Sequence, residues 1–206
     1  MLFRSGVYHF SQATSVSEAE KEAAYVVKVL SSDKSKIKLP VVFDYETNAS
    51  GRLNMSKLRK LAASGTSTRI CQAFCNKVKA AGYTPMVYAN YTMLTNYLDY
   101  KTLQKQYRIW LANYTTKGTA TTYPGEYWMW QYSSSGKVNG LSGSIDMNYI
   151  WDNGQGGSST SAPSTTATTT GSTTTTAGSS PSVAACDPYK VITTTDLNYK
   201  LSRIGG

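Results

Sequence analysis

The chain has 206 residues, of which 40% are hydrophobic and 16% charged, and its formal net charge is +9. This length and composition suffice for one domain with a hydrophobic core, and they exclude a disulfide-stapled mini-protein and a wholly disordered chain. One histidine, three cysteines and the absence of a G-x-S-x-G motif argue against a zinc site of the usual spacing and against a serine hydrolase. No apolar run reaches the roughly 18 residues of a membrane span, and the first residues lack a signal-peptide core, so we expect no membrane span and no export signal.

Positive charge is concentrated before residue 154. Residues 1–153 contain 18 lysines and arginines against 10 acids, which gives this segment a charge of about +8. A basic surface favours an anionic partner, whether nucleic acid, membrane surface or cell-wall polymer, although a solvated lysine-rich face explains the charge equally well. The 16 tyrosines and four tryptophans favour a surface that stacks on sugars or bases.

Composition divides the chain into three segments. Residues 154–182 are almost entirely Ser, Thr, Gly, Ala and Pro without a charge, which predicts a disordered linker. Residues 183–206 contain a candidate strand, Tyr189–Ile192, followed by Leu197–Tyr199, and are too short to fold alone. We therefore expect a folded domain over 1–153, a linker over 154–182 and a short β stub over 183–206.

The first half of the folded segment alternates between strand and helix patterns. A strand is predicted at Gly6–Phe10, and the next, nearly all apolar, at Pro40–Asp44. Between them a helix begins at Ser15 or Ser17, each of which has Glu three residues later, and ends near Ser31. The buried face of this helix is predicted to hold Ala19, Ala23, Val26 and Leu30.

The same alternation continues to residue 150. A second helix carries Ile70, Phe74, Val78 and Ala81, is closed by Gly82 and leads into a strand at Pro85–Ala89. A third helix is predicted over Thr92–Gln106, followed by a strand at Arg108–Ala112 and by a hairpin of Tyr127–Tyr132 with Ser144–Asn148. The pattern predicts an α/β fold with a parallel sheet, with about five barrel strands and a terminal hairpin instead of the eight strands of a full (β/α)₈ barrel.

Two carboxylates stand at the end of the second strand. Asp44 and Glu46 are two residues apart, so strand alternation places both on the same face, at the end of a parallel strand where barrel enzymes carry their chemistry. Like charges held this close raise one pKa, which provides the proton donor and the anion that cleavage of a glycosidic bond needs. Their spacing allows both retention and inversion, and acids at strand ends also cap helices or bind cations.

Six segments in chain order resemble successive strands of glycoside hydrolase family 25, the Chalaropsis-type lysozymes, which also occur as phage endolysins. The resemblance covers about residues 3–151. The segments are Gly6–Ser11, Leu39–Glu46, Gly82–Tyr88, Ile109–Tyr114, Trp130–Ser133 and Gly143–Asn148.

The resemblance implies an N-acetylmuramidase on a TIM-like (β/α) barrel that cuts the β-1,4 bond between N-acetylmuramic acid and N-acetylglucosamine in peptidoglycan, without a metal or other cofactor. By position, the resemblance implies that Glu46 is the general acid/base, that Asp44 steadies the acetamido group of the substrate as internal nucleophile, and that Asp146 lines the same cleft. Tyr8, Tyr88 and Gln131 match positions that contact sugar. Packing in the barrel core is the alternative for Tyr8 and Tyr88, and it is the expected role of Trp110, Trp128 and Trp130.

The chain also departs from the family pattern. Family members begin with a strand that carries a catalytic aspartate, followed by a second strand, whereas this sequence begins at what resembles the third. The resemblance thus implies an incomplete barrel that lacks its first two strands and exposes the edge of the strand at Val7. Residues Val191–Lys200 resemble the start of a bacterial Src-homology-3-like wall-binding domain, which places the full-length parent in the cell wall or outside the cell.

Two alternatives to a muramidase remain. A truncated, inactive remnant would bind peptidoglycan or anionic wall polymers without cutting. A nucleic-acid-binding protein rests on charge and aromatic content alone, and since no recognition motif accompanies them we expect no nucleic-acid partner. Cys71 and Cys75 lie four apart on one helical face and are expected to be small buried apolar residues instead of a disulfide or metal site.

Overall fold

The computed structural model describes residues 5–115, 121–150 and 192–193. Its elements are the strands β1 (Ser5–Ser11), β2 (Ile37–Tyr45), β3 (Pro85–Asn90), β4 (Arg108–Ala112), β5 (Met129–Gly136), β6 (Ile145–Ile150) and β7 (Ile192–Thr193), the helices α1 (Val16–Leu30), α2 (Met55–Ala63), α3 (Thr66–Ala80), α4 (Tyr91–Asn96) and α5 (Tyr100–Gln106), and the 3-10 helix η1 (Ser31–Lys36). The linker and most of the predicted β stub, Cys186 included, lie outside the described residues.

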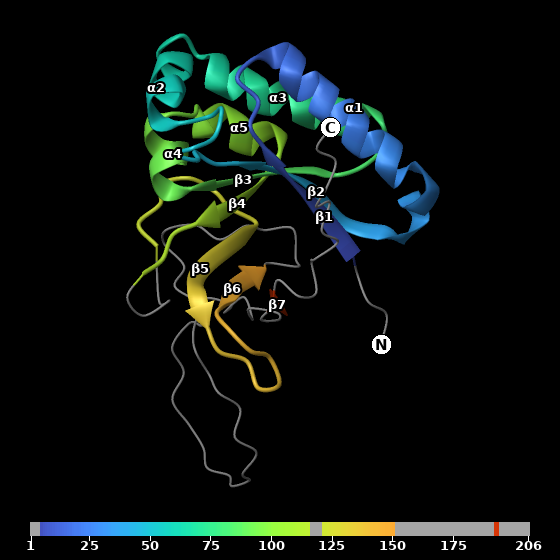
Figure 1. The fold of residues 1–206 in the computed structure, drawn as a ribbon, viewed down its shortest axis with the longest axis vertical. Helices are drawn as coiled ribbons and strands as arrows, with labels where there is room; N and C mark the ends of the chain where they lie inside the picture. Colours follow the sequence, from blue (N-terminus) through green and yellow to red (C-terminus); the bar gives the residue numbers. More distant parts are fainter. Residues whose placement is uncertain (1–4, 116–120, 151–191, 194–206) are drawn as a thin grey trace, which may run out of the picture.

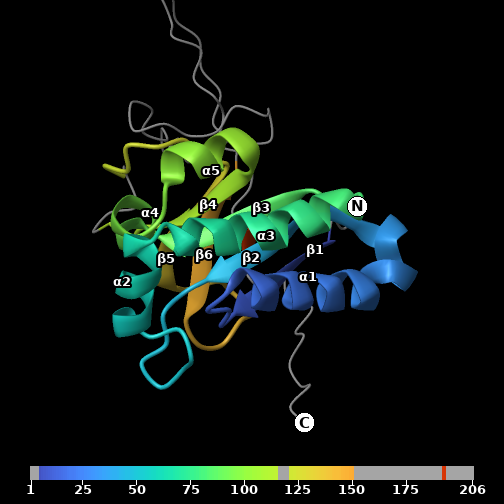
Figure 2. The same ribbon diagram turned by 90° about the horizontal axis from the view of Figure 1, so that it is seen from above.

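All strands belong to one sheet, in the order β1-β2-β3-β4-β5-β6-β7. Strands β1 to β5 run parallel, and β6 and β7 are antiparallel to their neighbours. The sheet curls into a half-barrel, and the helices cover its outer face (Figures 1 and 2). The predicted α/β class, parallel pairing and terminal hairpin are therefore confirmed, and β1, which carries Val7, forms one edge of the described sheet.

Strand alternation divides the buried side chains between two clusters. Val41, Phe43 and Tyr45 point from β2 into the large core beneath the helices, where Phe43 packs against Phe74 of α3 at a ring distance of 4.6 Å. Val42 points to the inner face of the half-barrel. Its neighbours in this smaller cluster are Met86, Tyr88, Trp110, Ala112, Trp128, Met129 and Ile150.

Helix α1 begins and packs as its sequence predicts. The Ser15 side chain accepts a hydrogen bond from the Glu18 backbone and caps the helix, and the four predicted core residues of α1 are buried. Helix α3 is followed by Gly82, whose φ of 82° is the left-handed conformation expected of a glycine after a helix. Cys71 and Cys75 of α3 are free and buried.

The helix predicted over Thr92–Gln106 is wrong, because the segment forms the two short helices α4 and α5. Asp99 separates them, since its side chain accepts hydrogen bonds from the Thr102 backbone and hydroxyl and starts a new helix. Helix α2, capped by Asn54, was not predicted. None of the helices among the described residues is long and apolar enough to cross a membrane.

Candidate functional site

The six residues predicted to act together line one cavity on the inner face of the half-barrel. It has a volume of about 310 Å³ and lies towards the carboxyl ends of the parallel strands. We call it the carboxylate cavity. Its lining residues are Tyr8, Asp44, Glu46, Tyr88, Trp110, Gln131 and Asp146. The structure thus brings together residues from six strands, while their chemical roles stay predictions.

Each side chain reaches the cavity because of its place in the strand alternation. Phe43 and Tyr45 point into the core beneath the helices, so Asp44 and the residue after the strand, Glu46, point to the inner face. Asp44 pairs in register with Tyr88 of β3, which brings the phenol beside the carboxylates. The buried aromatic residues Tyr88 and Trp110 also pack against each other, 4.9 Å apart edge to face, so Tyr88 takes part both in the inner core and in the cavity wall.

The three acids of the cavity have raised pKa values. Burial, and then the charge of Glu46, raise the pKa of Asp44 to about 8, and its buried Oδ1 has no hydrogen-bond partner. Burial also raises the pKa of Glu46, with a further contribution from Asp146, and the polar contact with the Tyr88 hydroxyl opposes this shift. The pKa of Asp146 is raised by burial against a hydrogen bond from Gln131. The cavity therefore retains protons at a pH where exposed carboxyls have lost them.

Gln131 links the two sides of the cavity. Its Oε1 accepts a hydrogen bond from the Tyr88 hydroxyl at 2.7 Å and one from the Tyr114 hydroxyl at 3.1 Å. Because Gln131 also lies beside Asp146 and Tyr88 beside Glu46, a row of polar side chains connects the two carboxyls. Gln131 and Tyr88 are both buried, so the hydrogen bond between them is protected from water and keeps the two side chains oriented.

A second cavity of about 430 Å³ adjoins Glu46 on the side of α2 and α4. We call it the tyrosine cavity. It is lined by Glu46, Thr47, Met55, Asn90, Tyr91, Thr92, Met93, Tyr97, Ala112, Asn113 and Tyr114. Tyr114 is 56% exposed at its rim. No motif in the sequence predicts a role for these tyrosines, although Tyr114 follows β4 much as Glu46 follows β2, and that position is the signal that identifies it.

Gln12 contacts the backbone of Glu46, and no motif in the sequence indicates this contact. The Gln12 Nε2 donates to the backbone carbonyl of Glu46 at 3.3 Å and to that of Ser11 at 3.1 Å. Its Oε1 accepts from the Leu53 backbone at 3.1 Å. One amide therefore ties the end of β1 and the loop that leads to α2 to the backbone of Glu46.

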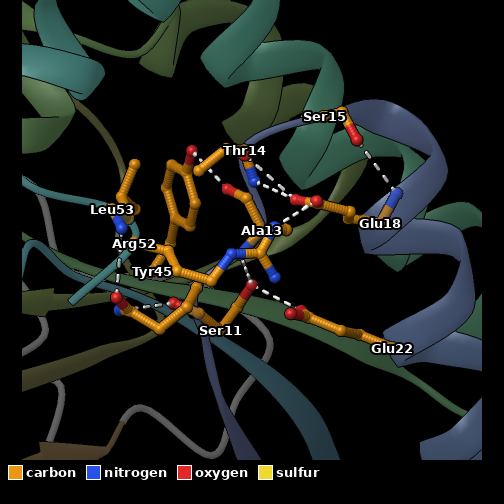
Figure 3. Close-up of polar contacts among 10 residues, drawn as sticks. Ser11, Ala13, Thr14, Ser15, Glu18, Glu22, Tyr45, Arg52 and Leu53 are labelled. Carbon is orange, nitrogen blue, oxygen red and sulfur yellow. Dashed lines mark hydrogen bonds and ion pairs between the residues drawn. The ribbon is translucent and has the colours of Figure 1, made fainter.

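The loop that carries Gln12 is itself fixed to α1, as Figure 3 shows. The Ser11 hydroxyl donates to Glu22 at 2.5 Å, and the Thr14 backbone donates to Glu18 at 2.7 Å. Arg52, in the loop after β2, pairs with the same Glu18. Two loops at the carboxyl ends of β1 and β2 thus share an anchor on α1, which limits movement of the segment bearing Glu46.

No three side chains of His, Cys, Asp or Glu within the described ranges lie close enough to hold a metal ion together. The chemistry visible in the two cavities is that of coupled carboxyl groups, which can hold and transfer protons.

The raised pKa of Asp44 predicts a measurable effect on stability. The folded chain keeps this proton up to about pH 8, while the unfolded chain loses it near the ordinary value of 3.8. Stability should therefore fall as pH rises through this window, by at most about 1.4 kcal/mol per pH unit. The free energy of unfolding, measured with urea, should therefore fall less steeply in Asp44→Asn than in the parent between about pH 5 and about pH 8. At the upper end of this range the free energy of unfolding of Asp44→Asn should exceed that of the parent.

The matched control for this experiment is Asp33→Asn. Asp33 lies at the surface, partly exposed, and its pairing with Lys36 lowers its pKa, so this variant should keep the parent's pH dependence above about pH 5. Parallel profiles for Asp44→Asn and the parent would contradict a buried, protonated Asp44.

Comparison with known proteins supports one family. The profile of glycosyl hydrolases family 25 matches residues 2–141. The lysozyme of Lactococcus phage mv1 is 29% identical over 131 residues, which are 62% of this chain and 61% of that protein. The chain therefore spans less than two thirds of this relative's length.

Solved structures agree with this assignment. The CTP1L endolysin is 30% identical and superposes with a TM-score of 0.53 over 72% of this chain and 47% of its own. The catalytic domain of endolysin ply40, from bacteriophage P40 of Listeria monocytogenes, shares the fold at 24% identity with a TM-score of 0.54, over 69% of this chain and 65% of that domain. The profile, which matches well over half of the chain, shows that the protein belongs to glycosyl hydrolases family 25.

Proposed function

We propose that this chain is the hydrolytic part of a lysozyme-type enzyme that cleaves peptidoglycan at the β-1,4 bond between N-acetylmuramic acid and N-acetylglucosamine. Family membership and relatives named as lysozymes and endolysins support a glycan of the bacterial wall as substrate. The wall, outside the cell membrane, is then where the enzyme acts. We assign proton transfer to Glu46, assistance to Asp44 and a further contribution from Asp146 in the same cavity.

The observation that carries this proposal is the position of Glu46 between two cavities. It is the one described residue that lines both the carboxylate cavity and the tyrosine cavity. Each cavity has the volume of an ordinary ligand site. A glycan chain that fills both with successive sugars must pass Glu46, so the bond between those sugars lies within reach of this carboxyl group.

The raised pKa values define how the proton is used. Burial keeps a proton on the Asp44–Glu46 pair at neutral pH, and in the free protein Asp44 is the more strongly desolvated partner. An acetamido N–H that donates to Asp44 favours the ionised form of Asp44, which leaves the proton on Glu46. The substrate therefore completes the arrangement of an acid beside an anion.

The reaction then proceeds in two balanced steps. The acetamido oxygen bonds to the anomeric carbon as the glycosidic bond breaks, while Glu46 gives its proton to the leaving oxygen and the ionised Asp44 stabilises the positive charge of the cyclised acetamido group through its N–H. Water next adds to the anomeric carbon, Glu46 takes up one of its protons and the acetamido group is restored. Tyr8, Tyr88 and Gln131 face the same cavity and are assigned to sugar contacts.

The roles of the acids are tested by the release of reducing ends from purified peptidoglycan. Glu46→Gln should lower the rate by about 10³-fold, because the proton donor is lost, and Asp44→Asn by about 10²-fold. Glu20→Gln, which removes an exposed acid on α1, should be unaffected. Activity that survives in Glu46→Gln would refute its role. A parent chain that sediments with peptidoglycan but releases no reducing ends would instead establish the wall-binding alternative.

The Gln12 contacts predict a role in positioning Glu46. Gln12→Ala should lower kcat about tenfold or more and change KM less than about twofold, because the carboxyl group shifts while the sugar contacts remain. A side chain at Gly51 would overlap the Gln12 Oε1, so Gly51→Ala should produce the same split between kcat and KM. Gln72→Ala, which removes an amide bonded to Gln106 on the surface, is the control. If Gln12→Ala instead lowers both kcat and the melting temperature and also raises KM, Gln12 has a structural role alone.

A further inference from the structure

A third cavity lies at the opposite end of the strands from Glu46. It has a volume of about 390 Å³ and is formed where β3 and β4 begin, with the ends of α3 and α5 beside it. We call it the basic cavity, after the cations that line it: Lys79 at the end of α3, Lys105 at the end of α5 and Arg108, the first residue of β4.

No acid forms an ion pair with these cations in the part of the chain that the structure describes. Glu126 nevertheless lines the same cavity. Lys79 and Lys105 stand in the last turns of their helices, where a cation complements the helix dipole. The dipole explains their sign but not their convergence with Arg108, which belongs to a strand.

The aromatic walls of the cavity are rigid. The Arg108 guanidinium lies 4.3 Å from the ring centre of Trp128, which is buried. The Tyr107 hydroxyl donates to Asn76 at 2.7 Å, and the Tyr83 hydroxyl donates to the Leu30 carbonyl at 3.0 Å. The tyrosine walls are therefore held by hydrogen bonds of their own, and the ring of Trp128 positions the Arg108 guanidinium without neutralising its charge.

We infer that the basic cavity binds a phosphodiester-linked polymer attached to peptidoglycan. Two ammonium groups and a guanidinium around one concave, aromatic-walled site suit the repeated anions of such a chain, and Arg108 can bind a phosphate through two parallel hydrogen bonds. The inference rests on the proposed function in placing the chain at the cell wall. The basic cavity and Glu46 lie at opposite ends of the strands, so the chain has room to bind the polymer and the glycan at the same time.

The experiment measures binding to sacculi by sedimentation in the Glu46→Gln background, which keeps the sacculi intact. Sacculi that carry a poly(glycerol phosphate) polymer are compared with the same sacculi stripped of it by hydrofluoric acid. The test variant combines Lys79→Gln, Lys105→Gln and Arg108→Gln. The control of equal charge combines Lys21→Gln, Lys28→Gln and Arg59→Gln, which alter exposed cations that line none of the three cavities.

The test variant should lose about tenfold or more of its affinity for polymer-bearing sacculi, while the control stays within about twofold of the parent and all three bind stripped sacculi alike. Equal losses in both triple variants would overturn the inference in favour of diffuse charge. If the test variant also loses affinity for stripped sacculi, the inference is overturned, because the cavity then binds the glycan or its peptides. Equally tight binding of duplex DNA that the test variant abolishes would assign the cavity to nucleic acid.

Two further measurements keep the result interpretable. The substituted side chains are exposed, so the melting temperature should be unchanged, and the single variants carry the same test if the triple variant unfolds. With Glu46 intact, the test variant should release reducing ends from stripped sacculi at the parent's rate. If the parent itself releases no reducing ends, the proposed function is contradicted, but the binding result still tests the basic cavity.

Discussion

The site depends on the alternation of side chains along β2. Phe43 and Tyr45 are buried beneath the helices, and this burial forces Asp44 and Glu46 onto the inner face, where the sheet curls around them. A shift of one residue in the pairing of β2 would exchange the two sets, placing carboxyls in the core and aromatic rings in the cavity. Packing of the outer face therefore secures the chemistry of the inner face, and the Gln12 contacts extend this control to Glu46, beyond the last residue of the strand.

The same strand direction separates the charges of the molecule. Asp44, Glu46 and Asp146 gather in the carboxylate cavity, whereas Lys79, Lys105 and Arg108 surround the basic cavity where β3 and β4 begin. Burial raises the pKa of the acids, while the cations stay exposed to solvent. The positive charges of the chain are therefore not spread evenly, since three of them gather at the basic cavity. This distribution is compatible with the acids of the carboxylate cavity, because opposite ends of the sheet carry the opposite charges.

Much of this arrangement could be predicted from the sequence. The apolar runs and helical periods predicted the strands β1 to β4 and the helices α1 and α3, because burial on both faces of a parallel sheet leaves a clear pattern. The single helix over Thr92–Gln106 was wrong because the Asp99 side chain competes with the helix backbone, which an apolar period does not reveal. Gln12 and the tyrosine cavity could not be predicted, since they depend on how loops from distant parts of the chain meet.

In the proposed reaction Asp44 and Glu46 share a proton, which substrate binding delivers to Glu46. The pH dependence of kcat/KM for reducing-end release tests this claim most directly, because it reports the ionisation of the free enzyme. We expect a rate that falls as pH rises through about 8, where the pair loses its last proton, and a decline at a different pH in Asp44→Asn. If the rate already falls near the ordinary pKa of an exposed carboxyl, and if this decline occurs at the same pH in Asp44→Asn, the shared proton is contradicted.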